Sequence, residues 1–308
     1  CYFSVDGIGS NDPVTDGYSD YASLGQYAVT GTLPTDSAWL PTAAGTAYQW
    51  SNPANWASNT LPNGVGATLR VNNNIAGDQT ITLAGLVTLG RLFLGDANST
   101  HAFTIQSGGA ALQFNNLAGP AVLSQTTGAN NFIAAPITLA GDLVVTNTTS
   151  GTLSLNGGIS GSGSLAKYGS GTLILGGVLT YTNGTMIGGG TLALDATAIF
   201  AGSVDIKTGA IFDSSLAGGL VLGTGANLSG QGVVIGDTAL NSGASLLPGG
   251  AGIAGTLTFS NQLTLNNGTT LHCDLAATET TGGGTNDLPK VGGALPPHGP
   301  VPVDTVFL

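Results

Sequence analysis

The stretch GSGSLAKYGSGTLILGGVLTYTNGTMIGGGTLAL, residues 161–194, decides the fold because it alternates short apolar runs with glycines. Two of these runs open alike, as Gly171-Thr172-Leu173-Ile174-Leu175 and Gly190-Thr191-Leu192-Ala193-Leu194. Each run is long enough for one strand and too short for a helix, and its alternation gives that strand one apolar face. We therefore expect short strands that are separated by glycine turns.

The same pattern extends over residues 76–275. Glycines that open such runs stand at positions 151, 171, 190, 209, 225, 243, 255 and 268, so the interval is about 19 residues at first and then shortens. One unit of this size cannot bury its apolar face alone, but units stacked coil on coil can. The sequence predicts an all-β fold, a right-handed parallel β-helix with an irregular N-terminal β or cap region. About ten coils would form a rod on the order of 45 Å long.

A β-sandwich is the competing architecture. It predicts hairpins with two-residue loops, and Asn183-Gly184 and Asn267-Gly268 fit such loops. The recurrence of Gly-Thr-Leu openings at nearly constant spacing favours stacked coils over hairpins.

Composition limits the function classes. Only 7% of the 308 residues are charged, against roughly 25% in an average globular protein, while 42% are hydrophobic. Five basic residues against 16 acidic ones are too few to replace the counterions of a nucleic acid, so we expect no nucleic-acid partner. No apolar run is long enough to cross a membrane as a helix, so this segment is not expected to insert. We expect a monomer without a cofactor, and a surface glycan or protein partner is left open.

Four regions differ in composition. Residues 1–37 look like the end of a preceding β-rich domain, with a strand at 26–33, and residues 38–75 form a Trp-rich cap or linker. Residues 76–275 carry the repeats, and residues 276–308 are a Pro/Gly-rich tail that we expect to be poorly ordered.

The three tryptophans, Trp39, Trp50 and Trp56, predict a hydrophobic plug, with a sugar-stacking site as the alternative. Because the chain begins with Cys and has no signal-peptide pattern, we expect a segment of a longer protein.

Candidate chemistry is sparse. The only histidines are His101, His272 and His298 and the only glutamate is Glu279, so the zinc-protease motif H-E-x-x-H is missing. The pattern Gly250-Ala251-Gly252-Ile253-Ala254-Gly255 leads into a predicted strand and not a helix, which argues against a phosphate loop. The run Gly188-Gly189-Gly190 lacks the aspartate of a calcium-binding nonapeptide repeat.

Two groups of aspartates remain as candidates. Asp12, Asp16 and Asp20 are weak calcium candidates, although aspartates in turns are usual. Asp195, Asp205 and Asp213 would serve a polysaccharide-acting enzyme if they converged in an exposed groove, because glycoside hydrolysis needs two carboxyls about 5–10 Å apart. We expect no catalytic residue in this chain.

The stretch 161–194 resembles the autotransporter-associated β-strand repeat. The residues that carry the resemblance are Gly161, Gly163, Leu165, Lys167, Gly169, Gly171, Thr172, Leu173, Leu175, Thr180, Tyr181, Thr182, Gly190, Thr191, Leu192 and Leu194. Asn183 before Gly184 departs slightly from the pattern at a turn, and Asn286-Asp287-Leu288 resembles a common end of such repeat regions. The resemblance implies a β-helical passenger or stalk with a structural or adhesive role, located extracellularly or on the bacterial cell surface.

A second, shorter resemblance concerns residues 17–31, GYSDYASLGQYAVTG. This segment is similar to one that follows the catalytic domain in some secreted bacterial zinc metalloproteases. The alternative function that it implies is a C-terminal accessory region of such a protease, with the catalytic domain upstream of Cys1.

Overall fold

The computed structural model describes Thr15 and residues 36–57, 59–274 and 286–293. The chain divides into two units, Cys1–Leu33 and Pro34–Leu308. The second unit contains all of the described residues except Thr15. The strand predicted at 26–33 lies outside the described residues, and so does the predicted tail except for residues 286–293.

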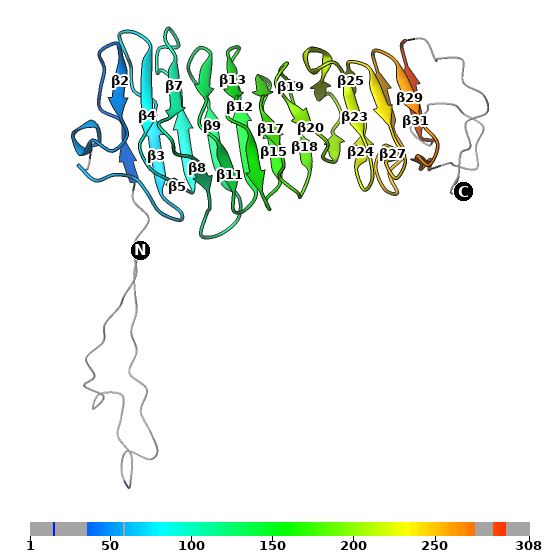
Figure 1. Ribbon diagram of the computed structural model, residues 1–308, viewed down its shortest axis with the longest axis horizontal. Helices are drawn as coiled ribbons and strands as arrows, with labels where there is room; N and C mark the ends of the chain where they lie inside the picture. Colours follow the sequence, from blue (N-terminus) through cyan, green and yellow to red (C-terminus); the bar gives the residue numbers. More distant parts are fainter. Residues whose placement is uncertain (1–14, 16–35, 58, 275–285, 294–308) are drawn as a thin grey trace. The chain divides into compact units, whose positions relative to one another are not determined.

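The second unit is an all-β parallel solenoid, and each full coil contributes one strand to each of three faces (Figure 1). Every pairing between named strands is parallel and joins one coil to the next, as the repeat pattern predicted. The described residues contain no α-helix, only two short 3-10 helices, η2 (Pro53–Asn55) and η3 (Ser215–Ala217). The predicted parallel β-solenoid is confirmed, and its right-handed sense stays a prediction.

Two sheets of eleven strands form two of the faces. The first sheet contains β1 (Asp36–Ala38), β3 (Thr68–Val71), β6 (Arg91–Leu94), β9 (Ala121–Gln125), β12 (Leu143–Asn147), β15 (Leu165–Tyr168), β18 (Thr185–Ile187), β21 (Val204–Ile206), β24 (Asn227–Gly230), β27 (Ser245–Pro248) and β30 (Thr270–Leu271). The second sheet contains β2 (Gly45–Gln49), β4 (Gln79–Leu83), β7 (Phe103–Ser107), β10 (Asn131–Ile133), β13 (Thr152–Leu155), β16 (Thr172–Leu175), β19 (Thr191–Leu194), β22 (Ile211–Asp213), β25 (Val233–Ile235), β28 (Thr256–Phe259) and β31 (Leu288–Val291).

The third face is divided into two sheets of six and three strands. The longer sheet contains β5 (Val87–Leu89), β8 (Leu112–Phe114), β11 (Ile137–Leu139), β14 (Ile159–Gly161), β17 (Val178–Leu179) and β20 (Ile199–Phe200), and the shorter one β23 (Leu220–Leu222), β26 (Thr238–Leu240) and β29 (Leu263–Leu265). The sheets thus run from Asp36 to Val291, beyond the repeat range of 76–275 at both ends.

Leucines of the repeat motif fill the interior. In β16 the side chains of Leu173 and Leu175 are buried, while Thr172 and Ile174 face outward, and β19 repeats this pattern. The register pairs Leu173 with Leu192 and Leu175 with Leu194, so that equivalent leucines stack from coil to coil. Burial of one such side chain stabilises the fold by about 1.5–3 kcal/mol. Leu165 is also fully buried, which accounts for all five motif leucines.

The motif glycines let neighbouring coils approach. Gly161 has a φ of +117°, a left-handed conformation, and a Cβ there would collide with the carbonyl oxygen of Leu139 in the preceding coil. Gly163 has an ordinary φ, but a Cβ there would collide with the carbonyl oxygen of Gly141. The glycine pattern therefore reflects contact between coils as well as turns.

The expected shortening of the repeat is wrong. Thr152 pairs with Thr172 and Thr172 with Thr191, which gives coils of 20 and 19 residues. Later coils vary without a trend, since Val204 pairs with Leu228, Asn227 with Ser245 and Ser245 with Thr270, which gives coils of 24, 18 and 25 residues. The glycines counted in the sequence belong to different corners. Those at 151, 171, 190, 209 and 255 precede strands of the second sheet, and those at 225, 243 and 268 precede strands of the first.

The three tryptophans pack together at the first coil. Their side chains are buried, and the rings of Trp39 and Trp50 each meet Trp56 edge to face, with centroids 4.8 and 5.0 Å apart. The indole N–H of Trp39 donates to Oε1 of Gln79 at 2.8 Å. Because no ring face is open to solvent, the packing interpretation is confirmed and the sugar-stacking alternative is not supported.

The last described strand is held by a buried carboxylate. Asp287 accepts the backbone N–H of Gly255 through Oδ1 and that of Asp274 through Oδ2, both at 2.7 Å. These bonds join Gly255, just before β28, and Asp274, three residues after β30, to the start of β31, which pairs with β28. Asp287 therefore closes the last described coil.

We predict that Gly163→Ala lowers the thermal unfolding midpoint markedly, because a backbone oxygen must move and overpacking costs about 1–3 kcal/mol. Gly141→Ala is the matched control, since a Cβ at Gly141 meets nothing within 4 Å and its φ is ordinary. Thermal melts followed by circular dichroism compare the two variants. Equal midpoints would contradict the role assigned to close approach at Gly163.

Candidate functional site

The three aspartates of the enzymatic alternative do not converge. Asp205 lies on β21 of the first sheet, where its Oδ2 pairs with Nζ of Lys207 at 2.6 Å. Asp213 ends β22 of the second sheet, and Asp195 directly follows β19 of the same sheet. Among the residues that the structure describes, no three His, Cys, Asp or Glu residues are grouped to hold a metal ion. The structure thus places Asp205 on a different face from Asp195 and Asp213, which lie at the ends of the paired strands β19 and β22.

Turn formation explains two of these carboxylates. Oδ1 of Asp195 accepts the backbone N–H and the hydroxyl of Thr197, at 2.7 and 2.6 Å. Oδ1 of Asp213 accepts the same two groups of Ser215, at 2.9 and 2.6 Å. These are the local bonds that favour aspartate in turns.

Other sequence candidates fall in different places. Asp12, Asp16 and Asp20 lie outside the described residues, as does the protease-like segment 17–31. Gly255 precedes strand β28 and not a helix, as expected of a chance match to a phosphate loop. No helix among the described residues is both long enough and apolar enough to cross a membrane.

Buried polar side chains occupy the corner that follows the first sheet. Gln125 and Asn147 pair in register at the ends of β9 and β12, and both are buried. Nδ2 of Asn147 donates to the carbonyl oxygens of Gly151 and Thr172, each at 2.9 Å. Nε2 of Gln125 donates to the carbonyl oxygen of Ala129 at 3.0 Å. Side-chain amides thus donate hydrogen bonds to carbonyl oxygens at the corner, where the regular bonding between strands ends.

Asp96 serves the equivalent corner after β6. Its fully buried carboxylate accepts the backbone N–H groups of Ile75, Thr100 and His101. Burial by itself raises the pKa of Asp96, but these hydrogen bonds outweigh it and hold the pKa below its usual value. Asp96 therefore stays ionised as a structural acceptor.

Lys167 serves the corner that follows β15. Its side chain is fully buried, and Nζ donates to the carbonyl oxygens of Tyr168, Gly169 and Gly189 at 3.0, 2.8 and 3.0 Å. The three donors of the ammonium group are all used, and burial lowers the pKa of Lys167 to about 8. The lysine of the repeat motif thus bonds backbone of its own coil and of the next.

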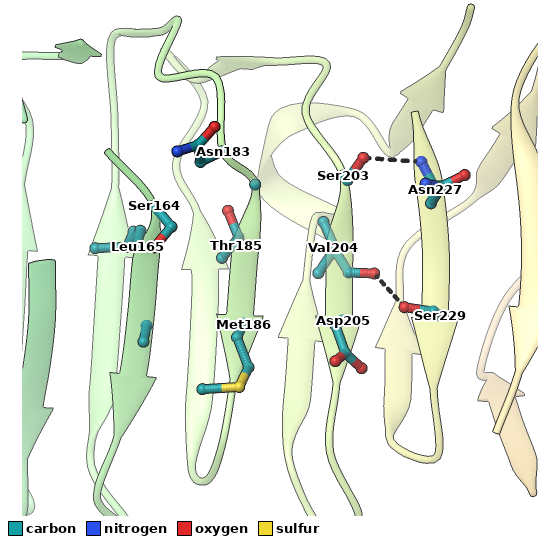
Figure 2. Close-up of a pocket in the computed structure, with 12 residues that line it drawn as sticks. Ser164, Leu165, Asn183, Thr185, Met186, Ser203, Val204, Asp205, Asn227 and Ser229 are labelled. Atoms are coloured by element: carbon teal, nitrogen blue, oxygen red, sulfur yellow. Dashed lines mark hydrogen bonds between the residues drawn. The ribbon is translucent and has the colours of Figure 1, made fainter. Parts of the chain in front are cut away.

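A hollow lies on the outer surface of the first sheet, across β15, β18, β21 and β24 (Figure 2). We call it the first-sheet groove, and its volume is about 400 Å³. Side chains that line it include Ser164, Ala166, Asn183, Met186, Ser203, Asp205, Asn227 and Ser229. Gly184 also lines it.

One outward row of side chains crosses the groove. The register places Ala166 beside Met186, Met186 beside Asp205, and Asp205 beside Ser229. Neighbouring strands lie about 4.8 Å apart, so the row spans about 14 Å along the solenoid axis. A second set, Ser164, Asn183, Ser203 and Asn227, lies at or just before the start of the same strands. The groove therefore offers hydroxyls, amides, one ion pair and a short apolar floor.

Sequence reasoning missed most of this groove. The sequence marks Asn183 as a turn residue, either in a hairpin loop or as a departure from the motif, and Asp205 as one of three candidate carboxylates. The others look unrelated in the sequence, because coils of unequal length separate them. The sequence does show which residues of each strand face outward. It does not show which of these residues are neighbours, because that depends on the register between coils.

Comparisons with known proteins add no relative to this picture. No protein-family profile, curated protein or solved structure matches the chain.

We predict that stability rises between pH 8 and 10.5 because of Lys167. The folded chain releases the Lys167 proton near pH 8 and the unfolded chain near 10.5, so the unfolded state binds more protons in this window. The full difference is about 3 kcal/mol. Urea unfolding of the native chain and of Lys167→Met at several pH values isolates this contribution, since other titrating groups are common to both. The same pH dependence in both proteins would contradict the assignment.

Proposed function

We propose that this chain is a non-catalytic structural or adhesive passenger, or stalk region, of a bacterial protein that is secreted or exposed at the cell surface. One observation carries the proposal. Two parallel sheets extend without interruption from Asp36 to Val291, around an interior filled by stacked apolar side chains. Such a body suits a spacer, because it lengthens by whole coils without changing its cross-section.

Stiffness follows from the way in which coils are joined. Each coil bonds to its neighbours through three faces, and corner groups such as Lys167 add bonds between coils. Eleven strands in one sheet, at about 4.8 Å each, extend about 48 Å. Bending such a body would stretch backbone hydrogen bonds on one face, so it resists deformation.

The surface location is proposed on the repeat resemblance and on surface chemistry. The described outer faces carry mainly neutral residues, Thr, Ser and Gln together with Val, Ile and Ala, where most proteins carry charges, and the chain has only five basic residues. Such a surface is hydrated without attracting nucleic acids. It presents neutral groups to whatever the parent protein meets.

Removal of one whole coil tests the spacer role. The register pairs Ala121 with Leu143, so deletion of residues 121–142 from the full-length parent protein removes β9, β10 and β11. We predict that this variant folds, shortens by about 4.8 Å and still reaches the surface, as judged by antibody labelling of intact cells.

The matched control deletes residues 121–131, which removes only part of a coil. This deletion shifts the register and should abolish folding, seen as loss of the strand signal in circular dichroism. If the whole-coil variant folded but disappeared from the surface, or if the native protein were found only inside cells, the proposed function would be wrong.

A further inference from the structure

We propose that the first-sheet groove binds a neutral glycan. This inference deepens the adhesive part of the proposed function and depends on that function for its biological setting. The chemical argument for a glycan comes from the groove itself, which combines unused hydrogen-bonding groups, a small apolar floor and a neighbouring aromatic ring.

Two amides in the groove have no protein partner. The side chains of Asn183 and Asn227 are exposed, and within the described residues neither amide is hydrogen-bonded to another protein group. Each amide offers one acceptor and two donors. Sugar hydroxyls need both kinds of partner, so paired asparagines on nearby coils suit a hydroxyl-rich ligand.

Two hydroxyls complete the polar side of the groove. Oγ of Ser203 accepts the backbone N–H of Asn227 at 3.0 Å, which leaves its own O–H free to donate (Figure 2). Oγ of Ser229 donates to the carbonyl oxygen of Val204 at 3.4 Å, which leaves its lone pairs free to accept. The groove thus offers both donors and acceptors along its length.

An apolar floor and an exposed ring match the other face of a sugar. Ala166 and Met186 lie side by side in the groove. Tyr168, two residues after Ala166 on β15, is 40% exposed and lies against Gly188, where a Cβ would collide with its ring. Glycine at that position leaves room for the ring on the sheet. Sugar rings carry C–H groups that pack on such aromatic faces.

An extended peptide does not fit this site as an added strand. The strand β18 pairs with β15 on one side and with β21 on the other, so its backbone is already bonded. Strand addition needs an exposed sheet edge. Recognition at the groove must therefore use side chains alone.

Charged ligands fit poorly as well. Lys207 beside the groove is paired with Asp205 at 2.6 Å, and the nearby Lys167 is buried. The whole chain has a formal net charge of −11, which repels polyanions such as sulfated glycans. Asp205 is a single carboxylate and does not form a cation site. A neutral ligand remains.

A glycan array tests the inference on the purified chain. The probes are immobilised neutral oligosaccharides, with sialylated and sulfated oligosaccharides and unstructured peptides as the other arms. We expect binding to a subset of the neutral probes only. The proposed surface role is tested in cells, so failure on the array leaves that role intact and is distinguishable from its failure.

Variants then locate the site by titration calorimetry with the best neutral probe. Asn183→Ala and Asn227→Ala should each weaken binding about fivefold. Tyr168→Leu should weaken it about fivefold. Ala166→Leu adds bulk to the floor without removing a polar group and should weaken binding about tenfold. Phe132→Leu, at an aromatic ring that is 38% exposed on the second sheet, is the matched control for Tyr168 and should change nothing.

Circular dichroism melts establish that each variant is folded before it is titrated. Binding to charged probes or peptides alone, binding to no neutral probe, or unchanged affinity in folded Asn183→Ala and Ala166→Leu would each overturn the inference.

Discussion

Parallel hydrogen bonding between successive coils sets the distance at which every other group must fit. Because strands stack about 4.8 Å apart, any residue whose Cβ points along the stack collides with the coil before or after it. Gly161 and Gly163 avoid this collision because they have no Cβ. The same spacing brings Leu173 and Leu192 into contact, so that each coil covers the apolar face of its neighbour. The repeat motif is therefore a record of contact between coils.

Corners present the same constraint to polar atoms. Where the chain leaves a sheet, carbonyl and N–H groups lose their regular partners, and a buried orphan costs about 1–3 kcal/mol. Successive coils solve this with different side chains that reach the same corner, among them Asn147 and Lys167, which aligns with Val145. Lys167 is the costly solution because its charge is buried, but it reaches three carbonyls in two coils. Its three hydrogen bonds offset part of the penalty of burying the charge, and the lowered pKa is the part that remains.

The fold could be predicted from sequence because its two signals are local. Alternation in Thr172-Leu173-Ile174-Leu175 identifies a strand, and its near repeat at Thr191 identifies a coil. Coil length was not predictable, since corners accept insertions at little cost in loop entropy and equivalent glycines cannot be told from others. The expected shortening failed for that reason, and Ser245 pairs with Thr270 across a longer corner.

The candidate site depends on the register between coils, which cannot be read from the sequence. Ala166, Met186, Asp205 and Ser229 form one row only because three coils of different length bring them into register. A solenoid makes such rows freely, since outward positions are not needed for the core and can vary without loss of stability. Interior positions must repeat and outward ones need not. A departure from repetition on the outer surface, such as Asn183 in an otherwise regular motif, is therefore where function can be added to a structural body without weakening it.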